Sequence, residues 1–332
     1  MYSINSVKSL YFFVYSKTLR RWGIMIFVDG KDISNFISME EIIYLLEEYM
    51  KEMIKNPVRI DVGLTNRKIV FTCGQSNEKN ISGFRAYWRS NNPEFLDDIT
   101  IVVDNNNNKI KGIVIGKELG ILRTGGIGGI AIKYFSNPDA EILGIIGTGR
   151  QALAQCFAAL LVRRFKKVIV FSRNQSNIDQ FCNIVSSKKL NVEIIKGKSI
   201  KHVVTNSDVL ICATNSTIPL FPPNWVNKGT HINTIGPKEY GKSEMCSEIA
   251  DYCNYVMTDS LEQVINYPNS FFLSKHAKFN SIIDIRDFIT NSSYVRKSSD
   301  ITMFCSVGLS GTEVILANEI INRYTKSGSY NE

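Results

Sequence analysis

The chain has 332 residues, of which 44% are hydrophobic and 21% charged, so it is long enough for two ordinary domains and too apolar for extended disorder. Its formal net charge is +8, but the lysines and arginines are scattered, which argues against a nucleic-acid interface and suits a phosphate-bearing cofactor or an anionic substrate. Seven cysteines without a CxxC pair indicate reduced thiols in a cytoplasmic protein, and three histidines without ligand spacing argue against a metal site.

Residues 1–24 precede the first predicted element, a strand over 26–28. Their apolar run, 10–15, is too short to cross a bilayer, and no small-residue cleavage site of a signal peptide follows it. We therefore expect no membrane association and interpret residues 1–24 as a dispensable extension. A membrane-surface anchor is the alternative.

The next segment shows the pattern of a helix followed by a sheet. Ser38 and Glu41 form a capping box, which predicts a helix that ends at about residue 55, before Pro57. Short β-like runs follow, and the asparagines after Asp104 predict a turn between the last two strands. We expect an antiparallel sheet with strands at 68–73, 82–88, 99–103 and 109–115.

Beyond Glu141, strands and helices alternate. The run 142–146 is continuously apolar, as in a strand buried on both faces, and such alternation is typical of a parallel sheet with right-handed crossovers. The predicted strands are 142–146, 167–171, 192–195, 208–213, 231–234 and 255–258, and the predicted helices are 151–164, 176–186 and 200–205. A last helix is indicated by the apolar positions Val314, Ile315, Ala317, Ile320 and Ile321.

A glycine motif stands between the first strand and the first helix of this alternating part. It has the form GxGxxA and consists of Gly147, Thr148, Gly149, Arg150, Gln151 and Ala152. Gly147 permits a tight turn, Gly149 lets the backbone approach a pyrophosphate, and Ala152 allows close packing of helix on strand. The helix N-terminus then offers free amides to phosphate. The motif predicts a dinucleotide site, and a glycine-rich turn without a ligand is the alternative.

The end of the second strand distinguishes the two nicotinamide cofactors. A carboxylate there would accept the ribose hydroxyls of NAD, whereas this chain has Ser172, Arg173 and Asn174. Serine and asparagine can hydrogen-bond a 2′-phosphate, and an arginine can pair with it. We therefore predict NADP(H), with NAD(H) as the alternative if Arg173 is only a solvated surface charge.

These motifs occur together with others along the chain. They are Asn56-Pro-Val-Arg59, Gly83-Phe-Arg85, Leu122-Arg123-Thr124, the glycine motif, Thr214-Asn-Ser216, Gly229-Thr-His-Ile-Asn233 and Ser306-Val-Gly-Leu309. In this set the chain resembles the ornithine cyclodeaminase and mu-crystallin family, which includes alanine dehydrogenases and ketimine reductases. The resemblance implies a homodimer of α/β subunits. A Rossmann domain (136–305) would be inserted in a discontinuous α+β domain for substrate binding and dimerisation (25–135 and 306–332).

The resemblance also implies roles for single residues. Arginines at the positions of Arg59 and Arg123 hold the substrate carboxylate in the family, which a guanidinium fork does well; a structural ion pair is the alternative for either one. Thr214, Ser306 and Gly308 would line the nicotinamide end of the cofactor site.

Two departures from the family bear on catalysis. Arg85 stands where many members have an active-site lysine, and Lys238 stands where the cyclodeaminases have an aspartate. We assign Arg85 both to the catalytic centre, at the position of that lysine, and to substrate binding, although an arginine stays charged and transfers no protons. It lies in a strand whose Tyr87 and Trp88 face the substrate or pack in the core. Lys238 is a candidate replacement acid or base, or else a surface lysine. The family's acidic residue near Ser306 corresponds to Glu313.

We therefore expect an NADP(H)-dependent oxidoreductase that moves hydride between the nicotinamide and the α-carbon of a small amino or imino acid. One alternative is a true ornithine cyclodeaminase, a lyase that forms proline and ammonia from ornithine. The other is a dimer that binds cofactor or ligand and has lost catalysis. The changes at Arg85 and Lys238 argue against the cyclodeaminase.

Overall fold

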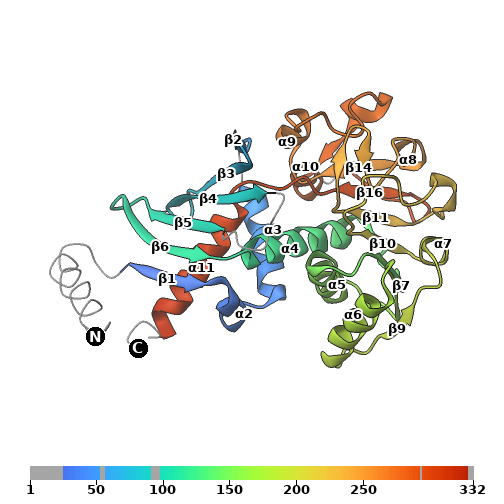
Figure 1. Cartoon of the computed structure of the whole chain (residues 1–332), viewed down its shortest axis with the longest axis horizontal. Helices are drawn as coiled ribbons and strands as arrows, with labels where there is room; N and C mark the ends of the chain where they lie inside the picture. Colours follow the sequence, from blue (N-terminus) through green and yellow to red (C-terminus); the bar gives the residue numbers. More distant parts are fainter. Residues whose placement is uncertain (1–24, 53–56, 91–97, 292–293, 328–332) are drawn as a thin grey trace, which may run out of the picture.

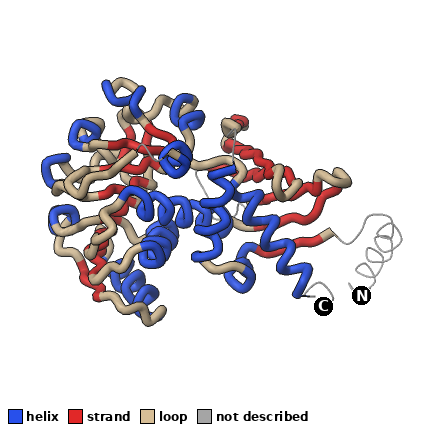
Figure 2. Tube along the Cα trace, turned by 180° about the vertical axis from the view of Figure 1, so that it is seen from behind, coloured by secondary structure: helices blue, strands red, loops and turns tan. Residues whose placement is uncertain are grey.

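The computed structural model describes residues 25–52, 57–90, 98–291 and 294–327 of the chain (Figure 1). Two large sheets lie side by side in Figure 1, and helices pack between them, as the view from behind in Figure 2 shows. The proposed N-terminal extension, 1–24, lies outside the described residues. Among the described helices, none is long and apolar enough to span a membrane.

The first sheet has six strands in the order β1-β6-β5-β4-β3-β2. Four of its five pairs are antiparallel, which confirms the antiparallel pairing predicted for the strands at 68–73, 82–88, 99–103 and 109–115, whereas β1 runs parallel to β6. Antiparallel pairing is imposed by short turns, whereas β1 joins the sheet from across several elements. The strands are β1 (Ile26–Asp29), β2 (Ile60–Gly63), β3 (Arg67–Ser76), β4 (Ile81–Ser90), β5 (Ile99–Asp104) and β6 (Lys109–Ile115).

Helices cover one face of this sheet. The helix α3 (Met39–Glu52) begins at the predicted capping box, where the backbone N–H of Ser38 donates to Glu41 Oε2 at 2.8 Å. The C-terminal helix α11 (Thr312–Ser327) contacts β3, β4, β5 and β6, and its predicted apolar face is buried. The short helix α2 (Ile33–Phe36) completes this layer. The sheet and the last helix, far apart in sequence, therefore share one core.

The helix α4 (Glu118–Phe135) joins the two sheets and was not predicted from the sequence. Glycine disfavours helices, and this segment contains several glycines. Their function here is close packing: a Cβ at Gly125 would lie 2.9 Å from the Cβ of Ala154 in α5, and a Cβ at Gly126 would lie 2.9 Å from Leu46 of α3. Tertiary contacts therefore outweigh the poor local propensity.

The second sheet has eight parallel strands in the order β15-β14-β16-β11-β10-β7-β8-β9. The predicted parallel α/β class is confirmed, and the strand order reverses between β7 and β10, where such folds bind ligands. Its strands are β7 (Ile142–Ile146), β8 (Lys167–Phe171), β9 (Glu193–Lys196), β10 (Val209–Cys212), β11 (His231–Thr234), β14 (Tyr255–Thr258), β15 (Ile283–Asp284) and β16 (Thr302–Cys305).

Helices form one layer on each face of this sheet. They are α5 (Arg150–Val162), α6 (Gln175–Ser187), α7 (Ile200–Thr205), α8 (Ile249–Tyr252), α9 (Leu261–Ile265) and α10 (Ile285–Thr290). Two further strands, β12 (Lys238–Glu239) and β13 (Lys242–Ser243), form a small hairpin just beyond the end of β11. The strands β15 and β16 were not predicted, because each is short and follows a long irregular stretch.

Candidate functional site

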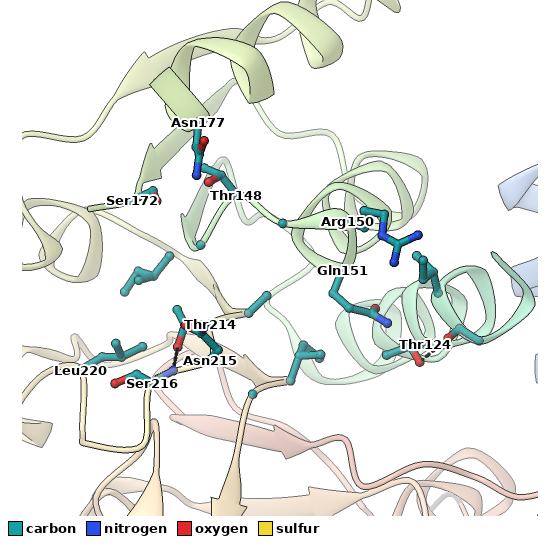
Figure 3. A pocket seen from close by; sticks show the side chains of 18 of the residues that line it. Thr124, Thr148, Arg150, Gln151, Ser172, Asn177, Thr214, Asn215, Ser216 and Leu220 are labelled. Carbon is teal, nitrogen blue, oxygen red and sulfur yellow. Dashed lines mark hydrogen bonds between the residues drawn. The ribbon is translucent and has the colours of Figure 1, made fainter. Parts of the chain in front are cut away.

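A cleft of about 1220 Å³ lies between the two sheets, at the carboxyl ends of β7, β8, β10 and β11 (Figure 3). The strand β4 and the start of α4 form its opposite wall. Most of the predicted site residues line it: Arg85, Arg123, Gly147, Thr148, Gly149, Arg150, Gln151, Ser172, Arg173, Asn174 and Thr214. The cleft thus joins the predicted cofactor motif to two of the predicted substrate arginines.

The glycine motif forms the turn from β7 into α5. Gly147 has φ +108°, and a Cβ there would collide with the carbonyl oxygen of Ala213, so only glycine fits. Gly149 has an ordinary φ of −76°, and a Cβ there would meet no atom within 4 Å. That open space, directly before the free amides of α5, suits a pyrophosphate. Ala152 does not line the cleft; it is fully buried against the sheet core, as its packing role requires.

The residues that follow β8 carry polar and basic groups toward the cleft. Ser172, Arg173, Asn174 and Asn177 line this part, and none of them is acidic. Asn174 also caps α6, because its side chain accepts a hydrogen bond from the backbone N–H of Asn177 at 3.3 Å. Arg173 is exposed. This end of the cleft therefore has room and charge for a phosphate and no carboxylate to repel it.

The opposite wall holds a buried charge cluster. Arg85 pairs through Nη2 with Asp98 at 2.5 Å and through Nη1 with Glu313 at 2.7 Å, and its guanidinium lies 4.4 Å from the ring centre of Tyr87. Arg123 pairs through Nε with the same Glu313 oxygen at 2.9 Å. The cluster thus brings together two arginines and two carboxylates from four segments, which are β4, the start of β5, α4 and α11.

The two carboxylates of the cluster differ in pKa. Burial would raise the pKa of Glu313, but Arg123 and Arg85 outweigh burial and lower it. Burial dominates for Asp98, whose pKa is raised in spite of Arg85. Two arginines contact one oxygen of Glu313, whereas only one arginine contacts Asp98. Glu313 is therefore the negatively charged partner that both arginines share.

The cluster leaves hydrogen-bond donors for a ligand. Arg85 Nε is buried without a partner, and among the described contacts Arg123 uses only its Nε. The two Nη groups of Arg123 can thus meet a carboxylate in two parallel hydrogen bonds. Tyr87 and Trp88 also line the cleft beside Arg85.

Besides Ala152, four predicted residues do not line the cleft. Arg59 lies 5.4 Å above the ring of Tyr267, with Nε 3.7 Å from Asp61. Ser306 and Gly308 belong to a turn that wraps Asp259: Ser306 Oγ donates to it at 3.2 Å, and the backbone N–H of Gly308 at 3.0 Å.

The fourth of these residues is Lys238, which is 1% exposed, so its interpretation as a surface lysine is wrong. Its Nζ donates to the carbonyl oxygen of Gly236 at 2.7 Å, and Gly236 lines the cleft. Burial lowers the pKa of Lys238. Lys238 therefore lies behind the wall of the cleft and contacts that wall through the carbonyl oxygen of Gly236.

Sequence reasoning missed two residues at the Arg85 end of the cleft. Asp98 lines the cleft as the partner of Arg85, and Gly120 lies beneath the Arg85 guanidinium, where a Cβ would be 2.5 Å from Nη2. Neither residue has a local signal, because Asp98 precedes a strand and Gly120 lies in the unpredicted helix. Only the fold brings them to Arg85.

The parallel sheet, with a glycine turn at its switch point and an open helix N-terminus, defines a Rossmann-type dinucleotide-binding protein. The sequence pattern of the ornithine cyclodeaminase/mu-crystallin family matches residues 46–328, so the chain belongs to this family.

Similar proteins span nearly the whole chain. A Delta(1)-pyrroline-2-carboxylate reductase of Bacillus thuringiensis subsp. konkukian is 24% identical over 324 residues, which cover 93% of this chain and 99% of the relative. The ketimine reductase mu-crystallin of Macropus fuliginosus is 26% identical over 67% of this chain and 68% of its own. A Delta(1)-pyrroline-2-carboxylate reductase structure from Thermococcus litoralis, in complex with NADH and L-proline, has a TM-score of 0.84 and 25% identity over 92% of this chain and 98% of that one.

Proposed function

We propose that this protein is an NAD(P)H-dependent imine reductase that converts a cyclic ketimine or another α-imino acid into the corresponding amino acid. The observation that carries the proposal is the position of the Arg85–Arg123 cluster, which lines the same cleft as the glycine motif. One end of the cleft thus suits a dinucleotide, and the other suits a small carboxylate. The imine-reducing activities named for the relatives support this choice.

A bound nicotinamide supplies the hydride, so the protein has to hold the imino acid beside it. Arg123 offers its two Nη groups to the carboxylate, and the unpartnered Nε of Arg85 adds a further donor. Arg85 serves as no base, because its two carboxylate partners hold it charged. An imine that binds already protonated needs no base from the protein.

Lys238 is our candidate proton donor for imines that bind neutral. Burial brings the pKa of this lysine down toward the range in which an ammonium can give up a proton. Replacement by methionine, Lys238→Met, should lower kcat by about 100-fold, a common loss when an acid is removed, and leave cofactor affinity unchanged. The exposed Lys242 provides the control, Lys242→Met. Wild-type kcat in Lys238→Met would remove Lys238 from the chemistry.

We propose NADP(H) as the preferred cofactor. The support is the polar and basic end of β8, where Arg173 and Ser172 line the cleft and no acidic residue does. NAD(H) remains the alternative, and the Thermococcus litoralis structure contains NADH. Fluorescence titration with NADPH and with NADH decides between them, and tighter binding of NADH would overturn the preference.

The decisive assay compares two reactions. Purified protein is offered a panel of cyclic and acyclic α-imino acids with NADPH or NADH, and separately L-ornithine with NADP⁺ or NAD⁺. We expect oxidation of the reduced cofactor with at least one imino acid and no proline from ornithine. Proline and ammonia at an enzymatic rate would establish the cyclodeaminase instead. Cofactor binding without turnover of any imine would favour the non-catalytic alternative.

Among the described residues, no helix covers the outer face of the six-stranded sheet, and this supports a homodimer. Its inner face packs on α11, whereas its outer face presents Phe27, Ile60 and Val62, which are 54%, 58% and 41% exposed. A second copy would cover this apolar face, which a monomer leaves in water. Light scattering should give a dimer, and Ile60→Asp should shift it toward monomer.

In this proposal the chain divides by function. Residues 25–135 and 306–332 bind substrate and dimerise, and residues 136–305 bind the cofactor. The seven cysteines are all free thiols, which supports a reducing compartment such as the cytoplasm.

A further inference from the structure

One carboxylate outside the cleft holds several groups that form its wall. Glu244 follows the strand β13 and is fully buried. Its Oε2 accepts hydrogen bonds from the backbone N–H of Thr214 at 3.0 Å and from Thr214 Oγ1 at 2.7 Å. Its Oε1 accepts from Thr234 Oγ1 at 2.7 Å, from the N–H of Ile235 at 3.1 Å and from the N–H of Gly236 at 2.7 Å.

These donors come from the ends of two neighbouring strands. Thr214 follows β10, and residues 234–236 end and follow β11. The N–H groups of Thr214 and Gly236 lie beyond the backbone ladder of the parallel strands, and a buried amide without a partner costs free energy. The N–H of Ile235 also donates to the carbonyl oxygen of Cys212 at 2.8 Å. Glu244 supplies the acceptor for both strand ends at once, so it fixes their relative position. The charge of the carboxylate makes each bond stronger than a neutral one.

The main chain of Gly236 is held by two hydrogen bonds, one through its N–H and one through its carbonyl oxygen. Its N–H donates to Glu244, and its carbonyl oxygen accepts from Lys238 Nζ at 2.7 Å. A Cβ on Gly236 would collide with Glu244 Oε2 and with the carbonyl oxygen of Thr214. The main chain of Glu244 adds a third contact, since its carbonyl oxygen accepts from the N–H of Leu220 at 2.9 Å. Thr214, Leu220 and Gly236 all line the cleft.

The groups that Glu244 holds lie on one side of the glycine turn. In Figure 3, Thr214 and Leu220 lie together on that side, whereas Ser172 and Asn177, at the end of β8, lie on the other. In doubly wound folds each half of the sheet receives one half of a dinucleotide. The β8 side suits the phosphate-bearing adenosine, so the β10–β11 side is left for the nicotinamide half.

We propose that Glu244 is the positioning residue for the nicotinamide half of the cofactor. It touches no ligand itself; it sets the positions of Thr214, Leu220 and Gly236, which form the wall on that side. The inference rests on the dinucleotide site of the proposed function but not on the imine chemistry. It also distinguishes Glu244 from the arginine cluster, which serves the substrate.

The test compares two ligands that differ only in the nicotinamide. NADPH contains both halves of the cofactor, and 2′-phospho-ADP-ribose lacks the nicotinamide. Glu244→Gln keeps the shape of the side chain but replaces one acceptor oxygen by an NH₂ donor, which then faces at least two other donors. We expect the Kd for NADPH to rise at least tenfold and the Kd for 2′-phospho-ADP-ribose to change less than twofold. Glu248→Gln, an exposed glutamate nearby, is the matched control.

A second variant covers the case in which Glu244→Gln does not fold. Thr234→Val removes one donor to Glu244 Oε1 at a fully buried position that does not line the cleft. We expect the same selectivity from it, with a loss of about threefold for NADPH alone. Circular dichroism confirms that each variant is folded before titration.

Three results would contradict the proposal. Equal losses for both ligands would show that Glu244 only supports the fold, and unchanged affinities would show that it positions nothing. Wild-type protein that binds neither of these ligands and does not bind NADH would contradict the dinucleotide site itself. Binding of both ligands without reduction of any imine would refute the proposed activity and leave the role of Glu244 standing.

Discussion

The two ends of the cleft are built in opposite ways. The centre of the proposed cofactor end is made of main chain: one glycine turn and the first amides of α5, within residues 147–152. The substrate end is made of charged side chains from four segments, with Glu313 between Arg85 and Arg123. A site made of main chain can be blocked by an added side chain without a loss of unfolding free energy. A site made of buried ion pairs couples binding to stability, so the two ends should respond differently to substitution.

The largest effect is expected at the centre of the charge cluster. Glu313→Gln removes the negative charge that two buried arginines share, and breaking a buried pair in this way costs about 3–5 kcal/mol of unfolding free energy. Urea denaturation measures it. Glu319→Gln on the same helix breaks only the half-exposed pair with Arg323 and should cost less than about 1 kcal/mol. Similar losses in both variants would refute the special position of Glu313.

Acid should reduce the difference between wild type and Glu313→Gln. Arg123 and Arg85 hold the pKa of Glu313 below its ordinary value of 4.5 in the folded protein. A carboxylate with a lowered folded pKa stabilises the protein above its unfolded pKa, and this contribution is lost as the pH falls through the folded pKa. The stability difference should therefore be constant near neutral pH and shrink below about pH 4.5. A difference that stays constant into strong acid would show that charge is not its cause.

The cofactor end should lose binding without losing stability. Gly149→Ala adds a methyl group in the open space before α5, where it meets no protein atom within 4 Å but obstructs an approaching pyrophosphate. We expect NADPH affinity to fall about 100-fold, roughly 2.7 kcal/mol, with an unchanged denaturation midpoint. Gly63→Ala, also free of neighbours within 4 Å but on the edge strand β2, is the control and should change neither quantity. Unaltered NADPH binding in Gly149→Ala would place the pyrophosphate elsewhere.

The same contrast governs how much the sequence could reveal. The glycine motif, the flanking strand and the helix are contiguous, so their spacing alone predicted the cofactor end. The arrangement of Asp98, Gly120 and Glu313 around Arg85 depends on segments up to 228 residues apart, and no local pattern encodes it. The family resemblance supplied Arg123 and the acidic position of Glu313, but not their contact.

The fold shows a parallel difference. Apolar runs predicted most strands of the eight-stranded sheet, because strands buried on both faces have a strong composition signal. The helix α4 escaped prediction because its glycines are explained only by the neighbours α3 and α5. The pairing of β1 beside β6 likewise follows from topology and not from turns. Local sequence patterns thus predicted most helices and strands, whereas tertiary packing determines the helix α4 and the position of β1.

The match between Gly120 and Arg85 offers a sharper test of the substrate end. A Cβ at Gly120 would lie 2.5 Å from Arg85 Nη2, so Gly120→Ala should push the guanidinium away from Asp98 and Glu313. Overpacking of this kind costs about 1–3 kcal/mol, partly offset by the roughly 1 kcal/mol that alanine gains over glycine in a helix. In an Arg85→Lys background the clash disappears, so Gly120→Ala should become neutral or stabilising. The double-mutant cycle should show a coupling of about 2 kcal/mol, and strict additivity would refute the match.

The smallest effect is expected at the rim of the cofactor end, where a side chain and not the main chain is proposed to act. Arg173 is exposed, so its contact with a 2′-phosphate is partly screened by water. Arg173→Ala should weaken NADPH about tenfold, roughly 1.4 kcal/mol, and leave NADH unchanged, because only NADPH carries the phosphate. Arg164→Ala, an exposed arginine away from the cleft, serves as control. Titrations at 50 and 500 mM salt separate the two possible origins: a direct phosphate contact predicts a difference between the cofactors that shrinks with salt. Equal weakening of NADH and NADPH would instead show that Arg173 acts on a part that both cofactors share, and the proposed preference for NADP(H) would fail.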